Sequence, residues 1–267
     1  MHPNTNTALH EPDKGARASA AMGGPAIWQD LLQPMHRSFG RLDSDPDASA
    51  AISETEAILF ALAQAVEQRD SHTAAHCERL AFISVALGIA MGLERGCLLA
   101  LYRGGYLHDI GKVGIPDSIL FKPGKLTPQE WFVMRSHTTR GVDICRHLRS
   151  LDSVVPIIRH HHERWDGSGY PDGLRGEQIP LMARVLQIAD IYDALTSPRP
   201  YKQAFSPAKA LRVIRDETDR GWRDPAVVRL FGTLHKGVIS KAAEYTAGSD
   251  GNLEAMRAAL SKLQLRP

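Results

Sequence analysis

Cysteine is scarce in this sequence, with three residues among 267 that lie far apart. Cys77, Cys97 and Cys145 form no C-x-x-C pair, which argues against both a disulfide framework and a zinc ribbon. Small buried thiols in a reducing compartment are expected at these positions. Any metal site in the chain must therefore be built from other side chains.

An excess of one charge and a long apolar run are also missing. The formal net charge is only +2, which argues against a binding surface for DNA, RNA or an anionic membrane. The longest mostly apolar run, Ala81 to Leu93, is shorter than the ~20 residues that span a membrane, and the N-terminus lacks the pattern of a signal peptide. We therefore expect a cytoplasmic protein that binds phosphate, if at all, through local groups.

Helical periodicity dominates from Ser53 onward, and an apolar fraction of 43% is enough for a packed core. No alternating pattern typical of a strand is found, whereas helical spacing recurs, as in Ile58, Leu59, Leu62 and Val66. Thr127 to Glu130 has the pattern of a capping box, and Ser206-Pro207 and Asp224-Pro225 indicate two further helix starts. The sequence predicts an all-α fold of about eight to ten helices.

Both ends and one internal segment depart from this pattern. Residues 1–48 are rich in Ala, Gly, Pro and Asp and predict a disordered or weakly ordered leader. Residues 241–267 predict a linker and an amphipathic helix that packs on the body or contacts a second copy in a homodimer. Residues 165–176 contain four glycines and a proline, so they predict a long loop of the kind that is often functional.

Histidine is abundant, with twelve residues, most of them between positions 72 and 162. His72 and His76 share one helical face, and His76 continues onto the apolar residues of that face. A single histidine there is more often a core residue, so metal binding requires partners. His108 and Asp109 supply them, although neighbours on a helix point about 100° apart. Flanking glycines are expected to let the backbone approach the ion: Gly104, Gly105 and Gly111.

Further candidate ligands follow along the chain. His137 is expected to end the helix that begins at Pro128. Residues 160–162 form a run of three histidines, which is rare by chance, although such a run can also be a solvated surface. Asp190 lies in an apolar helical segment, where a carboxylate is costly unless it is paired or bound to metal. Lys112 adds a cation that is placed to meet a phosphate.

Two metal ions that share Asp109 would use the ligands better than one ion. The candidates are five imidazoles and two carboxylates: His76, His108, Asp109, His137, His161, His162 and Asp190. Nitrogen and oxygen ligands without thiolate favour Fe, Mn or Zn over Mg or Ca. Paired ions can ionise a bridging water and hold the attacking and leaving oxygens of an in-line displacement. The pattern therefore predicts phosphoester hydrolysis.

From about Glu56 to Val238 the sequence closely resembles the HD-GYP domain, a bacterial branch of the HD-domain phosphohydrolases. Seven motifs carry the resemblance, in order: RDSHTAAH at 69–76, HDIGKVGIP at 108–116, MRSH at 134–137, HHE at 161–163, DGSGYP at 166–171, IADIYDAL at 188–195 and RPYK at 199–202. Residues 49–240 are therefore interpreted as an HD-GYP catalytic domain in the form of a helical bundle.

The resemblance implies a phosphodiesterase that opens cyclic di-GMP by attack of a metal-bridging hydroxide, with either pGpG or GMP as the end product. It implies two divalent ions, iron or manganese. One would be held by His76, His108, Asp109 and Asp190, and the other by Asp109, His137, His161 and His162. Asp109 and Lys112 would carry the catalysis, with Lys112 neutralising charge on the phosphate. Substrate contacts are implied for Lys112, Tyr170, Arg199 and Lys202.

Position 72 departs from the family pattern. Some members carry a glutamate there that helps hold a third metal, whereas this chain has His72. A third ion or a substrate contact at His72 is our hypothesis, and a histidine that touches neither is the alternative. His160, the extra member of the histidine run, is expected to face outward or to lie behind the ligands.

Two other functions remain open at this point. One is hydrolysis of a different nucleotide, such as a mixed cyclic dinucleotide, because the motifs do not reveal base contacts. The other is a signalling adaptor that binds diguanylate cyclase (GGDEF) domains through the Gly-Tyr-Pro loop with little turnover. The complete set of ligand positions argues against the adaptor, since a scaffold has no physical need of it.

Overall fold

The computed structural model describes residues 46–69, 76–197 and 203–248, with side chains described for 57–69, 76–197 and 203–239. These residues form ten α-helices and three short 3-10 helices, so the all-α prediction is confirmed. The elements are α2 (Pro46–Arg69), α3 (His76–Ala90), α4 (Arg95–Leu107), η1 (Ile110–Gly114), α5 (Asp117–Leu120), α6 (Pro128–Arg135), α7 (His137–Cys145), η2 (Arg149–Leu151), α8 (Val155–His160), η3 (Gly176–Gln178), α9 (Leu181–Thr196), α10 (Pro207–Asp219) and α11 (Pro225–Gly248).

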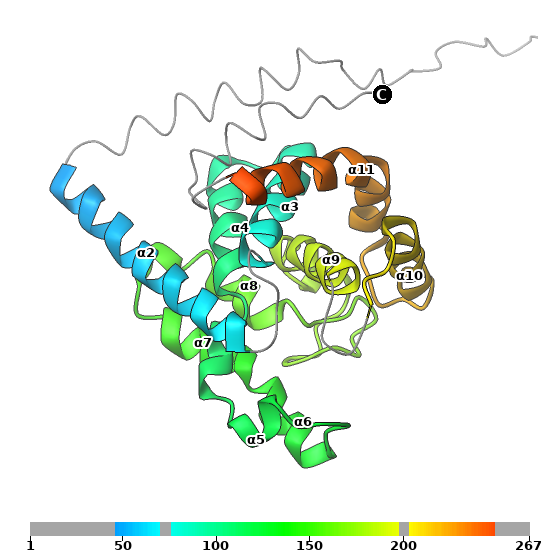
Figure 1. The fold of residues 1–267 in the computed structure, drawn as a ribbon, viewed down its shortest axis with the longest axis horizontal. Coiled ribbons are helices and arrows are strands. Elements are labelled where there is room, and N and C mark those ends of the chain that lie inside the picture. Colours follow the sequence, from blue (N-terminus) through cyan, green and yellow to red (C-terminus); the bar gives the residue numbers. More distant parts are fainter. Residues whose placement is uncertain (1–45, 70–75, 198–202, 249–267) are drawn as a thin grey trace, which may run out of the picture.

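Helix α3 forms the centre of the fold. It is buried on nearly every side and packs against α4, α9 and α11, as Figure 1 shows. Gly105 allows the closest of these approaches, because a Cβ atom there would lie 2.6 Å from the Cα atom of Ala81. The short helices α5 and α6 project from the body at the end of the molecule near α7. The bundle thus leaves the beginnings of α3 and α7 next to the end of α4.

The helix starts predicted from capping patterns are confirmed. Thr127 and Glu130 form the reciprocal capping box of α6. The Ser206 hydroxyl accepts from the Lys209 N–H at the start of α10, and Asp224 accepts from the second residue of α11, Ala226. The prediction for His137 was wrong. Helix α6 stops at Arg135 and His137 is the first residue of α7, because a new turn begins directly after Ser136.

The predicted apolar face of α2 is only partly correct. Ile58 and Leu62 are exposed, whereas Ala63, Val66 and Glu67 are buried. The helix is held to the body by Phe60, whose ring stacks on Tyr106 of α4 with centroids 4.5 Å apart. The buried face is therefore rotated from the one that apolar periodicity alone indicates.

Between α8 and η3 the chain forms neither a helix nor a strand. Its β-type pairing there is limited to an isolated antiparallel bridge between Asp166 and Arg175. The buried carboxylate of Glu163 holds this segment, because it accepts from the backbone N–H groups of Asp172 and Leu174 at 2.8 and 3.2 Å. Arg159 pairs with the Asp172 side chain at 2.7 Å. The segment is thus tied to the end of α8, where the histidine run lies.

Some of the predicted features fall on residues outside the described ranges. His72, Arg199 and Lys202 are among them, as are most of the predicted leader and the predicted amphipathic helix. The proposed boundaries at residues 48 and 240 lie inside α2 and α11, and the division into leader, domain and tail stays a prediction. In the described part of the chain, no helix combines the length and apolar character needed to cross a membrane.

Candidate metal centre

The adjacent pair His108 and Asp109 lies where α4 ends. His108 still has helical backbone angles, but Asp109 (φ −105°, ψ 8°) leaves the helix and directly precedes η1. This break lets the two side chains converge, with His108 Nε2 3.2 Å from Asp109 Oδ2. Two neighbours can therefore reach one ion without sharing a helical face.

The glycines around this pair have a different role from the one expected. A Cβ atom on Gly111 would lie 1.9 Å from the carbonyl oxygen of His137, and one on Gly105 would meet the backbone of α3. The space is thus filled by protein backbone, not left for an ion. Glycine at these positions lets α3 and α7 approach closely enough to bring His137 to Asp109 and His76 to His108.

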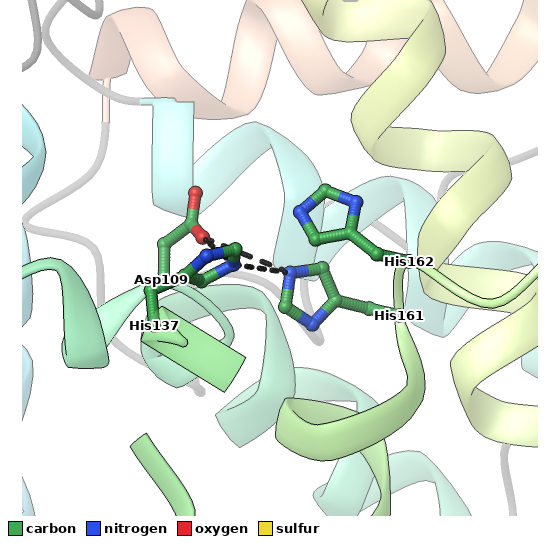
Figure 2. Close-up of side chains that lie close together, drawn as sticks. All are labelled: Asp109, His137, His161 and His162. Atoms are coloured by element: carbon green, nitrogen blue, oxygen red, sulfur yellow. Dashed lines mark hydrogen bonds and ion pairs between the residues drawn. The ribbon is translucent and has the colours of Figure 1, made fainter. Parts of the chain in front are cut away.

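Four of the predicted ligands form one cluster. The ligand atoms of Asp109, His137, His161 and His162 lie within 4.8 Å of one another (Figure 2). Asp109 Oδ1 is 3.2 Å from His137 Nε2 and 3.7 Å from His161 Nε2. A hydrogen bond to a backbone carbonyl fixes the orientation of each imidazole. Nδ1 of His137 donates to the Met134 carbonyl and Nδ1 of His161 donates to the Ile158 carbonyl, each at 2.8 Å. Their Nε2 atoms are left to face Asp109.

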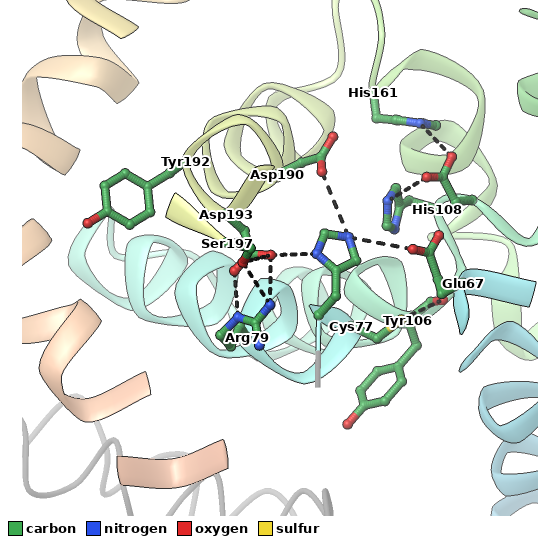
Figure 3. A network of polar contacts seen from close by, with 12 residues as sticks. Glu67, Cys77, Arg79, Tyr106, His108, His161, Asp190, Tyr192, Asp193 and Ser197 are labelled. Atoms are coloured by element: carbon green, nitrogen blue, oxygen red, sulfur yellow. Dashed lines mark hydrogen bonds and ion pairs between the residues drawn. The ribbon is translucent and has the colours of Figure 1, made fainter. Parts of the chain in front are cut away.

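Three more predicted ligands form a second cluster beside the first. His76, His108 and Asp190 come from α3, the end of α4 and α9, and their ligand atoms also lie within 4.8 Å of one another. His76 Nε2 is 3.9 Å from Asp190 Oδ1. Figure 3 labels Asp190 and His108 among the polar contacts around this cluster. The fold therefore brings together all seven predicted ligands. Asp190 is the most exposed member of this second cluster, with 21% of its side chain accessible.

The unsatisfied polar atoms of the site fit a cation. Asp109 Oδ1 and both ring nitrogens of His108 are buried, yet no group in the described part of the chain meets them with hydrogen-bonding geometry. Buried polar atoms of this kind are costly unless they are paired or bound to metal. Imidazole nitrogen and carboxylate oxygen, without a thiolate, are ligands that Fe, Mn and Zn accept.

The protonation states also suit metal binding. Burial, joined by the charges of neighbouring histidines, lowers the pKa of His161 and holds that of His162 well below its ordinary value. Burial raises the pKa of Asp109, but the charges of Lys112 and His108 outweigh it, so the pKa lies well below the ordinary range. Burial lowers the pKa of His108, and the nearby carboxylates reverse this and raise it to about 9.

Two predicted substrate-contacting residues lie at the same place. The Lys112 ammonium is 2.8 Å from Asp109 Oδ2 and largely buried. The Tyr170 ring stacks on His162 with centroids 4.9 Å apart, and the guanidinium of Arg135 also lies over this ring, 5.1 Å from its centroid. His160 lies apart from both clusters, with Nδ1 3.5 Å from Asp172.

Sequence reasoning missed two acidic residues. Glu67 of α2 is buried with its carboxylate 3.9 Å from His76 Nε2, and its ligand atom also lies within 4.8 Å of those of His108 and Asp109. Asp193 of α9 accepts from His76 Nδ1 at 2.7 Å. Glu67 lies on the same helical face as Ala63 and Val66. A carboxylate on an otherwise apolar face was the sequence feature that could have identified it as part of the site. Asp193, three residues after Asp190, gave the same kind of signal.

Comparison with known proteins shows the family to which this chain belongs. The sequence profile of the HD domain matches residues 61–227. The chain belongs to the HD domain family. Over 202 residues it is 41% identical to a Vibrio cholerae protein named "Cyclic di-GMP phosphodiesterase", covering 70% of this chain and 41% of that protein. Over 176 residues it is also 41% identical to "3'3'-cGAMP-specific phosphodiesterase 2" of the same organism, covering 65% of this chain and 34% of that protein.

A solved structure supports the fold. A Vibrio cholerae structure described as a cyclic GMP-AMP specific phosphodiesterase aligns with a TM-score of 0.56 at 22% identity, covering 78% of this chain and 59% of that one. The resemblance to the HD-GYP branch is confirmed by the named relatives and the fold by this structure. The chain spans less than half the length of the two curated relatives, so their whole-protein activities reach it only as proposals.

Proposed function

We propose that this chain is a metal-dependent phosphodiesterase that opens cyclic di-GMP to the linear dinucleotide pGpG, with GMP as the product of a second cut. The observation that carries the proposal is the pair of adjoining clusters, one around Asp109 with three imidazoles and the other formed by His76, His108 and Asp190. The relative named for this activity shares 41% identity across most of the chain.

The two clusters would hold two divalent ions, iron or manganese, with Asp109 between them. A bound pair of ions supplies activation of water and neutralisation of charge at phosphorus. Glu67, together with His108 and Asp109, forms a further group of potential ligands. This group supports a third ion more directly than His72, which lies outside the described residues.

The chain's own residues would bind and orient the phosphate. Lys112 is fixed by Asp109 at 2.8 Å and would place its cation beside a non-bridging phosphate oxygen. Tyr170, which contacts both His162 and Arg135, would line the edge of the site. Contacts from Arg199 and Lys202, a diguanylate cyclase partner, a homodimer and a cytoplasmic location stay predictions.

A mixed cyclic dinucleotide is the second candidate substrate. It is favoured by one observation, the 41% identity to a relative named for 3'3'-cGAMP, which equals the identity to the relative named for cyclic di-GMP. The metal clusters do not distinguish the two substrates, because both carry the same phosphodiester linkage.

The decisive experiment is product analysis with the full chain loaded anaerobically with Fe²⁺ or Mn²⁺. Cyclic di-GMP and 3'3'-cGAMP are supplied separately, and linear products are followed over time. Asp109→Asn is expected to lower turnover by at least about 10²-fold, because it weakens the shared ligand. Asp143→Asn, a change at an exposed carboxylate that pairs with Arg146 at 3.5 Å and belongs to neither cluster, is the matched control and should retain full activity.

The outcomes separate the candidate functions. Faster hydrolysis of cyclic di-GMP supports the proposal, and faster hydrolysis of 3'3'-cGAMP replaces the substrate. Binding without hydrolysis by the metal-loaded protein would favour the signalling adaptor. Equal activity of Asp109→Asn and the parent chain would remove this site from the reaction.

A further inference from the structure

Three of the ligand histidines show what holds an imidazole in this site. His137 and His161 each donate from Nδ1 to a backbone carbonyl one turn earlier. His76, the first residue of α3, donates instead to the carboxylate of Asp193 at 2.7 Å. In all three cases an acceptor fixes the proton on Nδ1 and leaves Nε2 to face the site. Only at His76, of these three, is the acceptor charged.

Asp193 is itself held in place by further donors. Its Oδ1 accepts from Arg79 Nε at 2.5 Å, and its Oδ2 accepts from Arg79 Nη2 at 2.9 Å and from the Ser197 hydroxyl at 3.2 Å. His76 Nδ1 faces this carboxylate, whereas His76 Nε2 lies 3.9 Å from a carboxylate oxygen of Asp190 and 3.9 Å from one of Glu67. Figure 3 shows the contacts of Asp193 with Arg79 and Ser197. Asp193 is 4% exposed, so the arrangement is shielded from water.

We propose that Asp193 is a positioning residue for the His76 ligand, with Arg79 as its support. The inference rests on the metal site of the proposed function. Asp193 belongs to neither ligand cluster, so its effect would pass through His76 alone. It selects the tautomer with Nε2 unprotonated, prevents rotation of the ring, and makes the ring a stronger ligand by placing a negative charge behind it.

The position of Ser197 gives this network a second connection. Ser197 follows the last residue of α9, donates to Asp193 and accepts from Arg79 Nη2 at 3.1 Å. The network therefore joins the start of α3 to the end of α9, the helix that carries Asp190. His76 and Asp190, which would share an ion, are placed relative to each other through this one buried carboxylate.

The test measures Mn²⁺ affinity and stoichiometry in the full chain carrying Asp193→Asn. Outer partners of metal-bound histidines typically contribute about 10- to 100-fold in metal affinity. We expect one ion to bind about 10- to 100-fold more weakly while the ion of the His137, His161 and His162 cluster keeps its affinity. Raising the Mn²⁺ concentration should restore kcat, with KM for the cyclic dinucleotide unchanged.

A matched control separates positioning from folding. Asp224 is equally buried and pairs with an arginine, Arg184, at 2.6 Å, but contacts no ligand histidine. Asp224→Asn should lower the melting temperature by a similar amount without changing metal affinity. A second variant, Arg79→Gln, leaves the carboxylate but removes its support, and a few-fold loss of affinity for the same ion is expected.

A readout independent of turnover is the ¹⁵N NMR spectrum of the metal-free protein, which distinguishes the two tautomers of His76. The parent should show a protonated Nδ1, and Asp193→Asn a mixture of tautomers. Unchanged Mn²⁺ affinity and an unchanged His76 signal in either soluble variant would overturn the inference. If the parent binds Mn²⁺ and Asp193→Asn weakens it, yet no cyclic dinucleotide is hydrolysed, the positioning role stands and the proposed substrate fails.

Discussion

The side chains of the site show how burial prepares single residues for metal binding. The environment that excludes water also lowers the pKa of His161 and His162, so both imidazoles are neutral at neutral pH, the form that binds metal. Asp109 remains charged in the same environment because Lys112 and His108 face it. A proton on His108, whose pKa is about 9, would leave when an ion binds.

Lys112 provides the first prediction at this scale. Lys112→Met keeps most of the side-chain volume and removes the cation, so kcat is expected to fall by about 10²- to 10³-fold, as for other preorganised charge-stabilising groups. Metal content, measured by elemental analysis, should stay at the parent level. Lys122→Met, at a lysine that pairs with Glu130 of α6 at 2.6 Å, is the control with unchanged kcat. Loss of metal together with activity would assign Lys112 to metal retention instead.

The thiols differ in reactivity for a physical reason. Burial raises the pKa of Cys145 to about 11, and burial raises that of Cys77 as well, so at pH 8 both are protonated and shielded. Cys97 is partly exposed, with a pKa raised by burial and by Glu94. Because the thiolate is the nucleophile, one thiol should react with Ellman's reagent in the folded protein and three after unfolding. A fast thiol that persists in Cys97→Ser would contradict this assignment.

Whether the role of a single residue could be predicted from the sequence depended on the kind of side chain. The seven candidate ligands were recognisable because core packing and solvation alone rarely produce histidines and aspartates in a fixed order of motifs. Glu67 and Asp193 were missed, since an acidic residue on a helix is usually solvated and only its inward direction distinguishes it. That direction is set by which side of α2 and α9 packs on the body, which is a tertiary property.

At the scale of elements, glycine sets the distance between helices. A Cβ atom on Gly105 would lie 2.6 Å from the backbone of Ala81, so Gly105→Ala must force α3 and α4 apart. We expect a loss of about 1–3 kcal/mol in the free energy of unfolding, the usual cost of overpacking. Denaturation in urea at equilibrium measures it.

Gly237 supplies the opposite case on helix α11. Nothing lies within 4 Å of a Cβ atom there, so Gly237→Ala should raise the free energy of unfolding by up to about 1 kcal/mol through helix propensity alone.

A stabilising effect of Gly105→Ala would contradict the first of these two predictions, because it would show that α3 and α4 can separate freely. Because those helices carry His76 and His108, Gly105→Ala should also weaken metal binding, whereas Gly237→Ala should not.

Helix ends were predictable and helix faces less so, for related reasons. The caps at Thr127, Ser206 and Asp224 depend on residues within one turn, so local sequence is sufficient. The exposed Ile58 and Leu62 show the limit of periodicity, because the packing of Phe60 on Tyr106 decides how α2 is rotated. His137 was placed at the wrong helix end, since the break at Ser136 carries no proline or glycine signal.

Over the whole molecule, the site connects elements that are distant in sequence. The two clusters draw on α3, the junction of α4 and η1, α7, the end of α8, and α9. The unfolded chain would not hold these ligands together, so an ion that binds them stabilises the folded state by mass action. Metal binding at the site should therefore raise the free energy of unfolding of the whole fold.

This connection gives the last prediction. At a free Mn²⁺ concentration about 100 times its dissociation constant, each bound ion should add about 2.7 kcal/mol to the free energy of unfolding, and each further tenfold increase should add about 1.4 kcal/mol per ion. For a chain of this size the melting temperature should rise by roughly 5–10 °C per ion. Asp109→Asn should lose most of the rise, while Asp143→Asn should keep it. Calorimetry with increasing Mn²⁺ measures the effect, and an equal rise in both variants would mean that the stabilising ion binds elsewhere, because only Asp109 of these two residues lies in the clusters.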